Sequence, residues 1–377
     1  MRIEEARSRR DLRRFIHFPE ELYRGDPLWA PPIWSEERET YSSRNPLLAR
    51  SDYVLLLAWD GGEPVGRILV YVDHQYNRYY GSKFGLFGSF ECIEDGAVAR
   101  ALLAAADSWL LQRGMERVRG PINPVSESWG FLVEGYERPP IFMAPYNPPS
   151  YNQFVTASGY DKVKDLIVYE GDSTNGYAIP ERFIRFRSEL FRRRPGLSIR
   201  RLNLRELRRE AEAICRISNE AIRENWGFVP LDPEELTTMF RKLRPIADPD
   251  AIWFVEDGGV PVGYCLGFPD LNQILRRIHG RLLPFGFLTL LTGLRKIRDF
   301  RLFGLAVLPK YHGMGLDVLL YMSLFETLAP RGVRLEANYI LEDNPRIRNA
   351  LVKLGLEQTI VYRVYEKTLQ PHEGGSP

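Results

Sequence analysis

The sequence predicts a mixed α/β fold that is present twice, once in each half of the chain. The first observation is a repeated turn motif: Asp60–Gly66 reads Asp-Gly-Gly-Glu-Pro-Val-Gly, and Asp257–Gly263 reads Asp-Gly-Gly-Val-Pro-Val-Gly. These copies are offset by 257 − 60 = 197 residues, and the pair Gly159-Tyr160 and Gly355-Leu356 is offset by 355 − 159 = 196. Two landmarks whose spacings agree to within one residue indicate a duplicated fold. The second observation is that apolar strand-like runs alternate with helical stretches, which is typical of a mixed α/β sheet.

The elements of the first half follow from local signals. An Asp-Gly-Gly turn between two apolar runs is typical of a β-hairpin. The stretch 96–113 carries Ala, Leu and Trp on one face and ends at Gly114, which indicates a helix. The stretch 120–149 is rich in Gly, Pro and Asn, and a loop of this length in a compact domain is usually functional. In chain order we also expect a helix at 12–23, strands at 51–59, 65–72, 84–92 and 117–119, a helix at 151–158 and a strand at 162–169.

The second half predicts the same plan. In chain order we expect a helix at 204–224, a hairpin at 252–268, a strand at 300–308, a helix at 316–328, a strand at 333–339, a helix at 345–353 and a strand at 359–365. Between the halves, 173–196 carries six arginines with aromatic residues between them; it indicates a solvated basic helix, with an anion-binding role as the alternative. The predicted domains are therefore 1–172 and 197–369, joined by the connector 173–196 and followed by a frayed tail at 370–377.

Length and composition agree with two globular domains. At 377 residues, each half can bury its own core. The net charge of +2, from 51 basic and 49 acidic residues, gives no bulk electrostatic reason to expect a nucleic-acid partner. The three cysteines lie far apart without the spacing of a zinc site, which favours a reducing, cytoplasmic setting and no metal. The charged stretch 1–14 lacks the apolar core of a secretory signal.

The clearest local motif is a strand end, a glycine turn and a helix start between Val307 and Asp317. Glycines in such a turn let backbone N–H groups converge, and the helix N-terminus adds partial positive charge, so the turn can hold a pyrophosphate. A strand precedes the turn, and a helix that begins after Asn344 follows about 30 residues later. The predicted cofactor-binding residues are Val307, Leu308, His312, Gly313, Met314, Gly315, Leu316, Asp317 and Asn344.

This combination resembles the GNAT superfamily of acyl-CoA-dependent acyltransferases. In that family a strand leads into an Arg/Gln-x-x-Gly-x-Gly/Ala turn that grips the CoA pyrophosphate, and a helix that begins at an Asn and ends near a Lys-Leu-Gly-Phe-like turn follows. The matching positions here are His312, Gly315, Asp317, Asn344 and Gly355. The resemblance implies two tandem GNAT-like domains, with acyl-CoA as the co-substrate of the second.

Three positions depart from the family pattern. His312 stands in place of the usual Arg or Gln, and Asp317 puts a carboxylate where a diphosphate would lie. Many members have a tyrosine general acid in the later helix, and Leu351 occupies that position here. In the first half the corresponding stretch, 90–96, has acids and no glycine turn, so we expect that half to shape the substrate site or to act as a scaffold.

The resemblance extends over the whole chain to a bacterial family of tandem-GNAT proteins. Most of its members are unassigned, and bacterial ceramide synthase, which acylates a sphingoid amine from a long-chain acyl-CoA, is similar to it. The stretch 125–129 departs from the Asn- and acid-containing segment of that family. The segments that carry the resemblance are 84–92, 120–124, 132–136, 145–151 and 225–230.

For the chemistry, N-acyl transfer requires a neutral amine and a polarised thioester carbonyl. In a GNAT-like frame, the backbone N–H near Val307 or Leu308 would polarise the carbonyl. Candidate bases are Glu336 and Glu342, with a solvated or salt-bridged role as the alternative for each, and His312, with a phosphate contact as its alternative. Tyr146, Asn147 and Tyr151 in the Pro-rich stretch are candidate acceptor-site residues, with loop packing as the alternative.

One uncharged stretch, 282–294, is flanked on both sides by basic residues. It is too short to span a bilayer. Basic ends around an apolar middle indicate an interfacial helix or a lid over an acyl chain, and a buried helix is the alternative. We therefore expect a peripheral membrane contact through 276–298, at the inner face of the membrane.

Together these observations predict an N-acyltransferase that moves an acyl group from acyl-CoA to a primary amine of a small molecule or a lipid. The contrasting hypothesis is a non-catalytic duplicated fold that binds a ligand or a partner. A third hypothesis is aminoacyl transfer from tRNA; the near-neutral charge opposes it, and the basic stretch 182–209 favours it.

Overall fold

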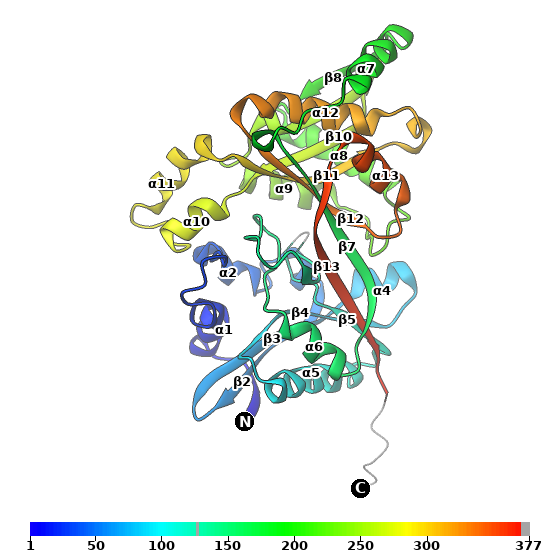
Figure 1. Ribbon diagram of the computed structural model, residues 1–377. Coiled ribbons are helices and arrows are strands. Elements are labelled where there is room, and N and C mark those ends of the chain that lie inside the picture. Colours follow the sequence, from blue (N-terminus) through cyan, green and yellow to red (C-terminus); the bar gives the residue numbers. More distant parts are fainter. Residues whose placement is uncertain (126–127, 371–377) are drawn as a thin grey trace. The chain divides into compact units, whose positions relative to one another are not determined.

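The computed structural model describes residues 1–125 and 128–370 and divides the chain into two compact units (Figure 1). Unit 1 comprises Met1–Leu166, Asn272–Phe287 and the chain from Ile360 onward, and unit 2 comprises Ile167–Leu271 and Leu288–Thr359. The domains predicted from the repeat are contiguous in sequence, whereas these units interleave. Each unit is a mixed α/β structure, which confirms the predicted fold class.

The sheet of unit 1 is antiparallel over its first four strands and then gains a parallel strand. β1 (Arg2–Glu5), β2 (Ser51–Asp60), β3 (Glu63–Asp73) and β4 (Phe84–Cys92) pair in that order, and β5 (Arg117–Gly120) runs parallel to β4. β6 (Phe131–Glu134) and β5 both pair antiparallel with β13 (Glu357–Thr368), the last strand of the chain. The strand that completes unit 1 therefore comes from the C-terminal half of the sequence.

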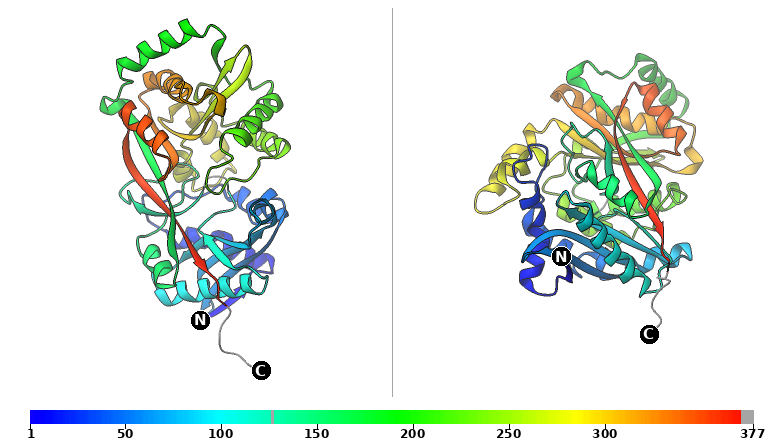
Figure 2. Two further views of the ribbon diagram at one scale, coloured as in Figure 1. Left: turned by 90° about the vertical axis from the view of Figure 1, so that its right-hand side faces the viewer. Right: turned by 60° about the horizontal axis from the view of Figure 1, so that its bottom comes forward.

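Helices cover both faces of this sheet (Figure 2). Side chains of a strand point alternately to its two faces. Val54 and Leu56 accordingly pack with α5 (Gly96–Leu111) and α6 (Ser150–Ala157), whereas Leu55 and Leu57 pack with α1 (Arg9–Leu22), α2 (Trp34–Thr40) and α3 (Pro46–Ala49). The unit also contains α4 (His74–Tyr80) and α10 (Asn272–Ile278).

Unit 2 repeats the strand plan. β8 (Leu197–Arg201), β9 (Ile252–Asp257), β10 (Val260–Pro269) and β11 (Asp299–Val307) form an antiparallel ladder, and β12 (Arg334–Leu341) runs parallel to β11. β7 (Asp161–Asp172), which enters unit 2 at Ile167, follows β12 in the strand order. The repeated topology is the duplication that the two offset landmarks predict.

The helices of unit 2 also lie on both faces of its sheet. α12 (Leu316–Leu328) crosses one face, where Cys265 Sγ donates to Leu320 O. α8 (Leu207–Ala221) lies on the other face, where Ser218 and Tyr264 share a hydrogen bond of 2.8 Å between their hydroxyls. The remaining α-helices that lie wholly or mainly in this unit are α7 (Glu181–Arg193), α9 (Pro233–Leu243), α11 (Gly286–Gly293) and α13 (Pro345–Leu354), and 3₁₀ turns lie at 173–175, 249–251, 294–296, 309–311 and 329–331.

Both predicted hairpins are confirmed. Asp60 pairs with Glu63, and Asp257 pairs with Val260. The glycine pairs between them have φ of 54° and 93° in the first turn and of 58° and 79° in the second. Two consecutive left-handed residues form the turn that matches the twist of a hairpin, and glycine adopts this conformation at little cost.

Among the described residues, no helix is both long and apolar enough to cross a bilayer. Over the same residues, no group of three or more His, Cys, Asp or Glu side chains is arranged to hold a metal ion.

Candidate functional site

The candidate site lies in unit 2, where two parallel strands part. β11 and β12 are paired from Asp299 with Arg334 to Leu302 with Ala337. Over the described residues beyond these pairs, β11 continues to Val307 and β12 to Leu341 without pairing to each other. A register shift in the β10–β11 ladder, at Leu266 and Gly267, lies beside the point where the pairing ends. The parting leaves one edge of β11 without a strand partner.

The free edge of β11 presents backbone groups near Val307. The N–H of Leu308 donates to Val262 O, which lies on the β10 side. Because successive residues of a strand direct their backbone groups to opposite edges, Val307 presents its N–H and C=O to the free edge. An N–H at such an edge can donate to a carbonyl oxygen of a ligand.

His312 closes the turn after this strand. Its Nε2 lies 2.9 Å from the carbonyl oxygen of Val307. A carbonyl only accepts hydrogen bonds, so the Nε2–H donates and only Nδ1 remains to accept a proton. His312 could contact a phosphate or act as a base only through Nδ1, or after the hydrogen bond from Nε2 to Val307 O has broken.

The glycine turn has the predicted backbone form, and an aromatic ring lies against it. Gly313 and Gly315 have φ of 82° and 74°, and α12 begins after Gly315 without a side-chain cap. A Cβ at Gly315 would lie 2.6 Å from Cζ of Phe186, which belongs to the connector helix α7. The backbone geometry fits an anion at the helix N-terminus. Phe186, and Asp317 in the first turn of α12, oppose that fit.

The later helix begins as predicted. The side-chain oxygen of Asn344 accepts from Ile347 N at 3.2 Å and caps α13. Leu351, at the family's tyrosine position, is buried in the hydrophobic core of unit 2. No hydroxyl is available from that position to protonate a leaving thiolate.

Glu336 is the most unusual acid of the unit. Its side chain on β12 is 1% exposed, and neither carboxylate oxygen has a hydrogen-bond partner among the described residues. The closest cation is Arg334, at 3.4 Å from Nη1 to Oε1. Burial raises the pKa of Glu336 to about 7; Glu170 and Asp270 act in the same direction, and Arg334 and Arg301 act against them. A carboxyl with this pKa exchanges its proton near neutral pH, as a general base does.

Several charged and polar side chains share one face of the strands beside Glu336. Arg301 lies directly across from Glu336 in the β11–β12 register and donates from Nε to Asn338 Oδ1 at 2.6 Å. Arg334, Glu336 and Asn338 alternate along β12 and therefore lie on one face, whereas Leu335 and Ala337 pack into the core. The ionisable residues of this group are Arg301, Arg334, Glu170, Asp270, Asp299 and Glu336.

This group contains four acids and two arginines. With every group ionised its net charge is therefore 2 − 4 = −2. Within this group, Glu336 has the raised pKa of a proton acceptor.

Glu342, the second candidate base, lies beyond the end of β12. Leu341 is five positions after Glu336 along the strand, a distance of about 16 Å. The carbonyl of Glu342 accepts from Arg348 Nη1 at 3.0 Å. The structure therefore does not bring the two acids together.

The predicted acceptor residues lie in unit 1, and their polar groups hold the local structure. Tyr146 donates from its hydroxyl to Asp26 Oδ2 at 2.5 Å. Asn147 is buried and accepts from Leu132 N at 2.7 Å. The hydroxyl of Tyr151 is bonded to both the N–H and the C=O of Cys92, each at 2.7 Å. These contacts correspond to the loop-packing alternative.

The turn of unit 1 that corresponds to 309–315 is capped by an acid. Asp95 accepts from Ala97 N at 2.7 Å at the start of α5. A carboxylate thus already occupies the helix N-terminus, as expected from a half without the glycine turn. Unit 1 also buries Arg67 against Glu91 with 2.5 Å between Nε and Oε2, and Arg67 donates to Phe15 O as well.

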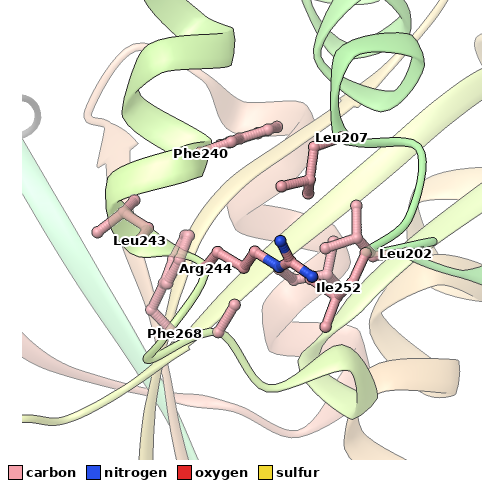
Figure 3. A pocket seen from close by; sticks show the side chains of 9 residues that line it. Leu202, Leu207, Phe240, Leu243, Arg244, Ile252 and Phe268 are labelled. Carbon is pink, nitrogen blue, oxygen red and sulfur yellow. The ribbon is translucent and has the colours of Figure 1, made fainter.

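The apolar cavity shown in Figure 3 does not provide a substrate pocket in this conformation. It lies in unit 2 between α9 and the strands, and its free volume of about 10 Å³ is room for about one water. Arg244 lies close to Leu202 and Ile252 there.

Comparisons with known proteins find relatives that match this chain over almost its whole length. No family model matches it. Protein YghO of Escherichia coli (strain K12) is 32% identical over 373 residues, which cover 96% of this chain and 94% of that protein. Bacterial ceramide synthase of Caulobacter vibrioides (strain NA1000 / CB15N) is 30% identical over 370 residues, which cover 95% of each. A solved tandem GNAT protein from the clavulanic acid biosynthesis pathway superposes with a TM-score of 0.57 at 13% identity, covering 99% of this chain and 100% of that chain. The chain belongs to the tandem-GNAT family.

A second solved structure agrees on the fold alone. The Enterococcus faecalis V583 protein described as a probable N-acyltransferase gives a TM-score of 0.53 at 10% identity and covers 98% of this chain and 72% of that one.

In this tandem-GNAT chain, sequence reasoning selected Glu336 but missed its neighbours. Arg301, Arg334 and Asn338 were not among the candidates, although the alternation Arg-Leu-Glu-Ala-Asn over 334–338 signals a strand with one polar face. Asp270 gave no such signal, because it follows the end of β10 and reaches the group only through the fold.

Proposed function

We propose that this protein is an acyl-CoA-dependent N-acyltransferase whose catalytic residues lie in unit 2. The observation that carries the proposal is Glu336, a buried carboxyl with a pKa of about 7 and without a hydrogen-bond partner among the described residues, beside the parting of β11 and β12. The glycine turn lies at the far end of β11, about 20 Å from Arg301 along the strand. The turn would contact the diphosphate at one end of β11, and the reaction would take place beside Glu336 at the other end. A long molecule such as acyl-CoA can reach from one to the other.

In this proposal, the residues act as follows. The N–H of a free-edge residue of β11 close to the point where β11 and β12 part, rather than that of Val307 at the far end of the strand, donates to the thioester carbonyl oxygen. Glu336 accepts the proton that the ammonium group loses. The amine nitrogen attacks the carbonyl carbon and loses its second proton to solvent. The carbon–sulfur bond breaks, and CoA leaves as a thiolate that solvent protonates, since Leu351 offers no acid.

We further propose a long-chain primary amine as the acceptor. The support is the 30% identity over 95% of the chain to a protein named bacterial ceramide synthase. Lipid substrates would gain about 0.8 kcal/mol for each CH₂ that the protein buries, which favours long chains over acetyl.

A second candidate function is ligand binding without catalysis. Phe186 against Gly315 and the carboxylate of Asp317 both favour it, because each opposes a diphosphate at the turn. Calorimetric titration with free CoA, acetyl-CoA and palmitoyl-CoA separates the two functions. The enzyme proposal predicts binding of at least one thioester, and binding of none of them would leave it without a co-substrate.

The direct test is a panel of acyl-CoA donors against amine acceptors, with free-thiol release as the readout. We expect thiol release that depends on both an acyl-CoA and a primary amine, and that is fastest with long acyl chains and a sphingoid base. Release with acetyl-CoA and small amines alone would contradict the lipid acceptor but retain the acyltransferase. No amine-dependent release with any donor would contradict both.

A further inference from the structure

The segment 281–298, here called the α11 segment, exposes an unusual amount of apolar surface. Leu283 is 82% exposed and Phe285 is 72% exposed. Of the fourteen exposed large hydrophobic side chains in the described residues, five lie within nine positions of this segment: Leu283, Phe285, Phe287, Leu288 and Leu291. Single exposed apolar residues are ordinary, whereas a contiguous group marks an interaction surface.

Basic residues border this apolar group on both sides. Before it lie Arg277 and Arg281, and after it lie Arg295, Lys296 and Arg298, all of them exposed. No Asp or Glu occurs from Asn272 to Arg298. An apolar centre with a cationic border complements a surface that is apolar inside and anionic outside, which describes an anionic phospholipid membrane.

The chain just before the segment is held in unit 1, which supports the exposed side chains of residues 281–287. The C-terminal end of α10 is bonded to α2, since Trp34 Nε1 donates to His279 O at 2.9 Å. Gly280 has a φ of 67°, and a Cβ there would lie 2.1 Å from Pro32 O, so only glycine fits this approach. Asn272 Nδ2 donates to Pro140 O at 2.9 Å. All these contacts lie within unit 1.

The dimensions of the helix fit an interfacial position. α11 has eight residues, and a helix of this length spans about 12 Å, less than half of a hydrocarbon core. Its exposed apolar residues can therefore enter the headgroup and acyl boundary but cannot cross the bilayer. Within 272–298 every charged residue is basic, and Arg281 at the start of the segment pairs with Glu20 Oε1 at 2.8 Å.

We propose that the α11 segment docks the protein on anionic phospholipid membranes. Leu283 and Phe285 enter the acyl boundary, and the flanking Arg and Lys side chains contact lipid phosphates. The docking is independent of the proposed catalytic activity, because it uses none of the residues of the β11–β12 site.

The test is co-flotation of the full-length protein with two kinds of vesicle, phosphatidylcholine alone and phosphatidylcholine with phosphatidylglycerol. We expect binding to the anionic vesicles that weakens with salt, and much weaker binding to the neutral ones. The double substitution Leu283→Glu with Phe285→Glu should lower the partition coefficient at least about tenfold. Arg295→Gln with Lys296→Gln should lower it about fivefold for each charge removed.

The matched control is Val260→Glu, which changes another exposed apolar residue, at the start of β10. It should leave vesicle binding unchanged, and circular dichroism establishes that all variants are folded. Equal binding by the wild type and the Leu283→Glu/Phe285→Glu variant would overturn the proposal. A concentration-dependent dimer that the double variant abolishes, without vesicle binding by the wild type, would assign the surface to a second copy of the chain instead.

Discussion

Glu336 is the residue on which the chemistry of unit 2 depends. Most buried carboxylates accept hydrogen bonds or pair closely with a cation, and this one has neither a hydrogen bond among the described residues nor a close bidentate arginine. A group held in this way costs stability, and proteins commonly retain such groups where they act on a substrate. That reasoning distinguishes Glu336 from Arg67 and Glu91 of unit 1, which are bonded to each other.

The raised pKa predicts how stability changes with pH. Below pH 4.5 the carboxyl of Glu336 is protonated in both the folded and the unfolded chain. Between pH 4.5 and about 7 the folded state retains the proton and the unfolded state loses it, so this residue makes the folded state less stable as the pH rises. The full effect, reached above pH 7, is about 3 kcal/mol.

Glu336→Gln removes this dependence, because glutamine does not ionise. We expect the variant to be more stable than the wild type at pH 8, by up to about 3 kcal/mol, and of similar stability at pH 4.5. Urea unfolding at the two pH values measures the difference. A variant that is less stable at pH 8 would mean that the carboxylate is stabilised by partners in the folded protein.

At the element scale, the connector helix α7 lies against the glycine turn that the sequence assigned to CoA. Phe186 from α7 is exposed, and the outer edge of its ring, at Cζ, lies against Gly315. Arg187 of the same helix pairs with Glu326 of α12, which keeps α7 on α12. A ligand at the turn would therefore have to displace the Phe186 ring.

Phe186→Ala should strengthen the binding of acyl-CoA by a few-fold, because the ligand would no longer compete with the ring for the turn. Ile184→Ala, which changes an exposed apolar residue of the same helix, is the matched control and should leave the affinity unchanged. Calorimetry with palmitoyl-CoA measures both dissociation constants. Weaker binding by Phe186→Ala would show that the ring contacts the ligand rather than excludes it.

The sequence predicted the elements with strong local signals. The two Asp-Gly-Gly hairpins and the helix that starts after Asn344 were predictable, because a turn residue or a cap determines each of them locally. The parting of β11 and β12 was not predictable, because only the register of the two strands shows where their pairing ends. The hydrogen bonds of the Asn147 and Tyr151 side chains could not be predicted from the sequence either, since their partners are distant in sequence.

At the scale of the whole molecule, the strand that completes unit 1 comes from the other half of the sequence. β13 pairs with β5 and β6, and Tyr365 packs into the core of unit 1 beside α5. Lys367 donates to Asp107 Oδ2 at 2.6 Å. The repeat alone could not reveal this exchange, because the final strand of each half carries the same apolar pattern.

The exchange predicts that the sequence-contiguous first half, residues 1–172, does not fold by itself. Without β13, β6 loses its strand partner, β5 pairs only with β4, and part of the core is exposed. We expect a broad, non-cooperative urea transition for this fragment by circular dichroism. The same fragment joined by a flexible linker to residues 357–370 should regain a cooperative transition. A cooperative transition of the isolated fragment would show that β13 is dispensable for unit 1.

The account as a whole depends on Glu336 as the base for an acyl transfer in unit 2. The most direct measurement is the rate of amine-dependent thiol release from palmitoyl-CoA by the wild type, Glu336→Gln and Glu342→Gln, followed from pH 5 to pH 9. We expect a wild-type rate that rises with an apparent pKa near 7, a loss of at least about a hundredfold in Glu336→Gln, and a nearly unchanged rate in Glu342→Gln. A folded Glu336→Gln variant with the wild-type rate and pH profile would contradict the account.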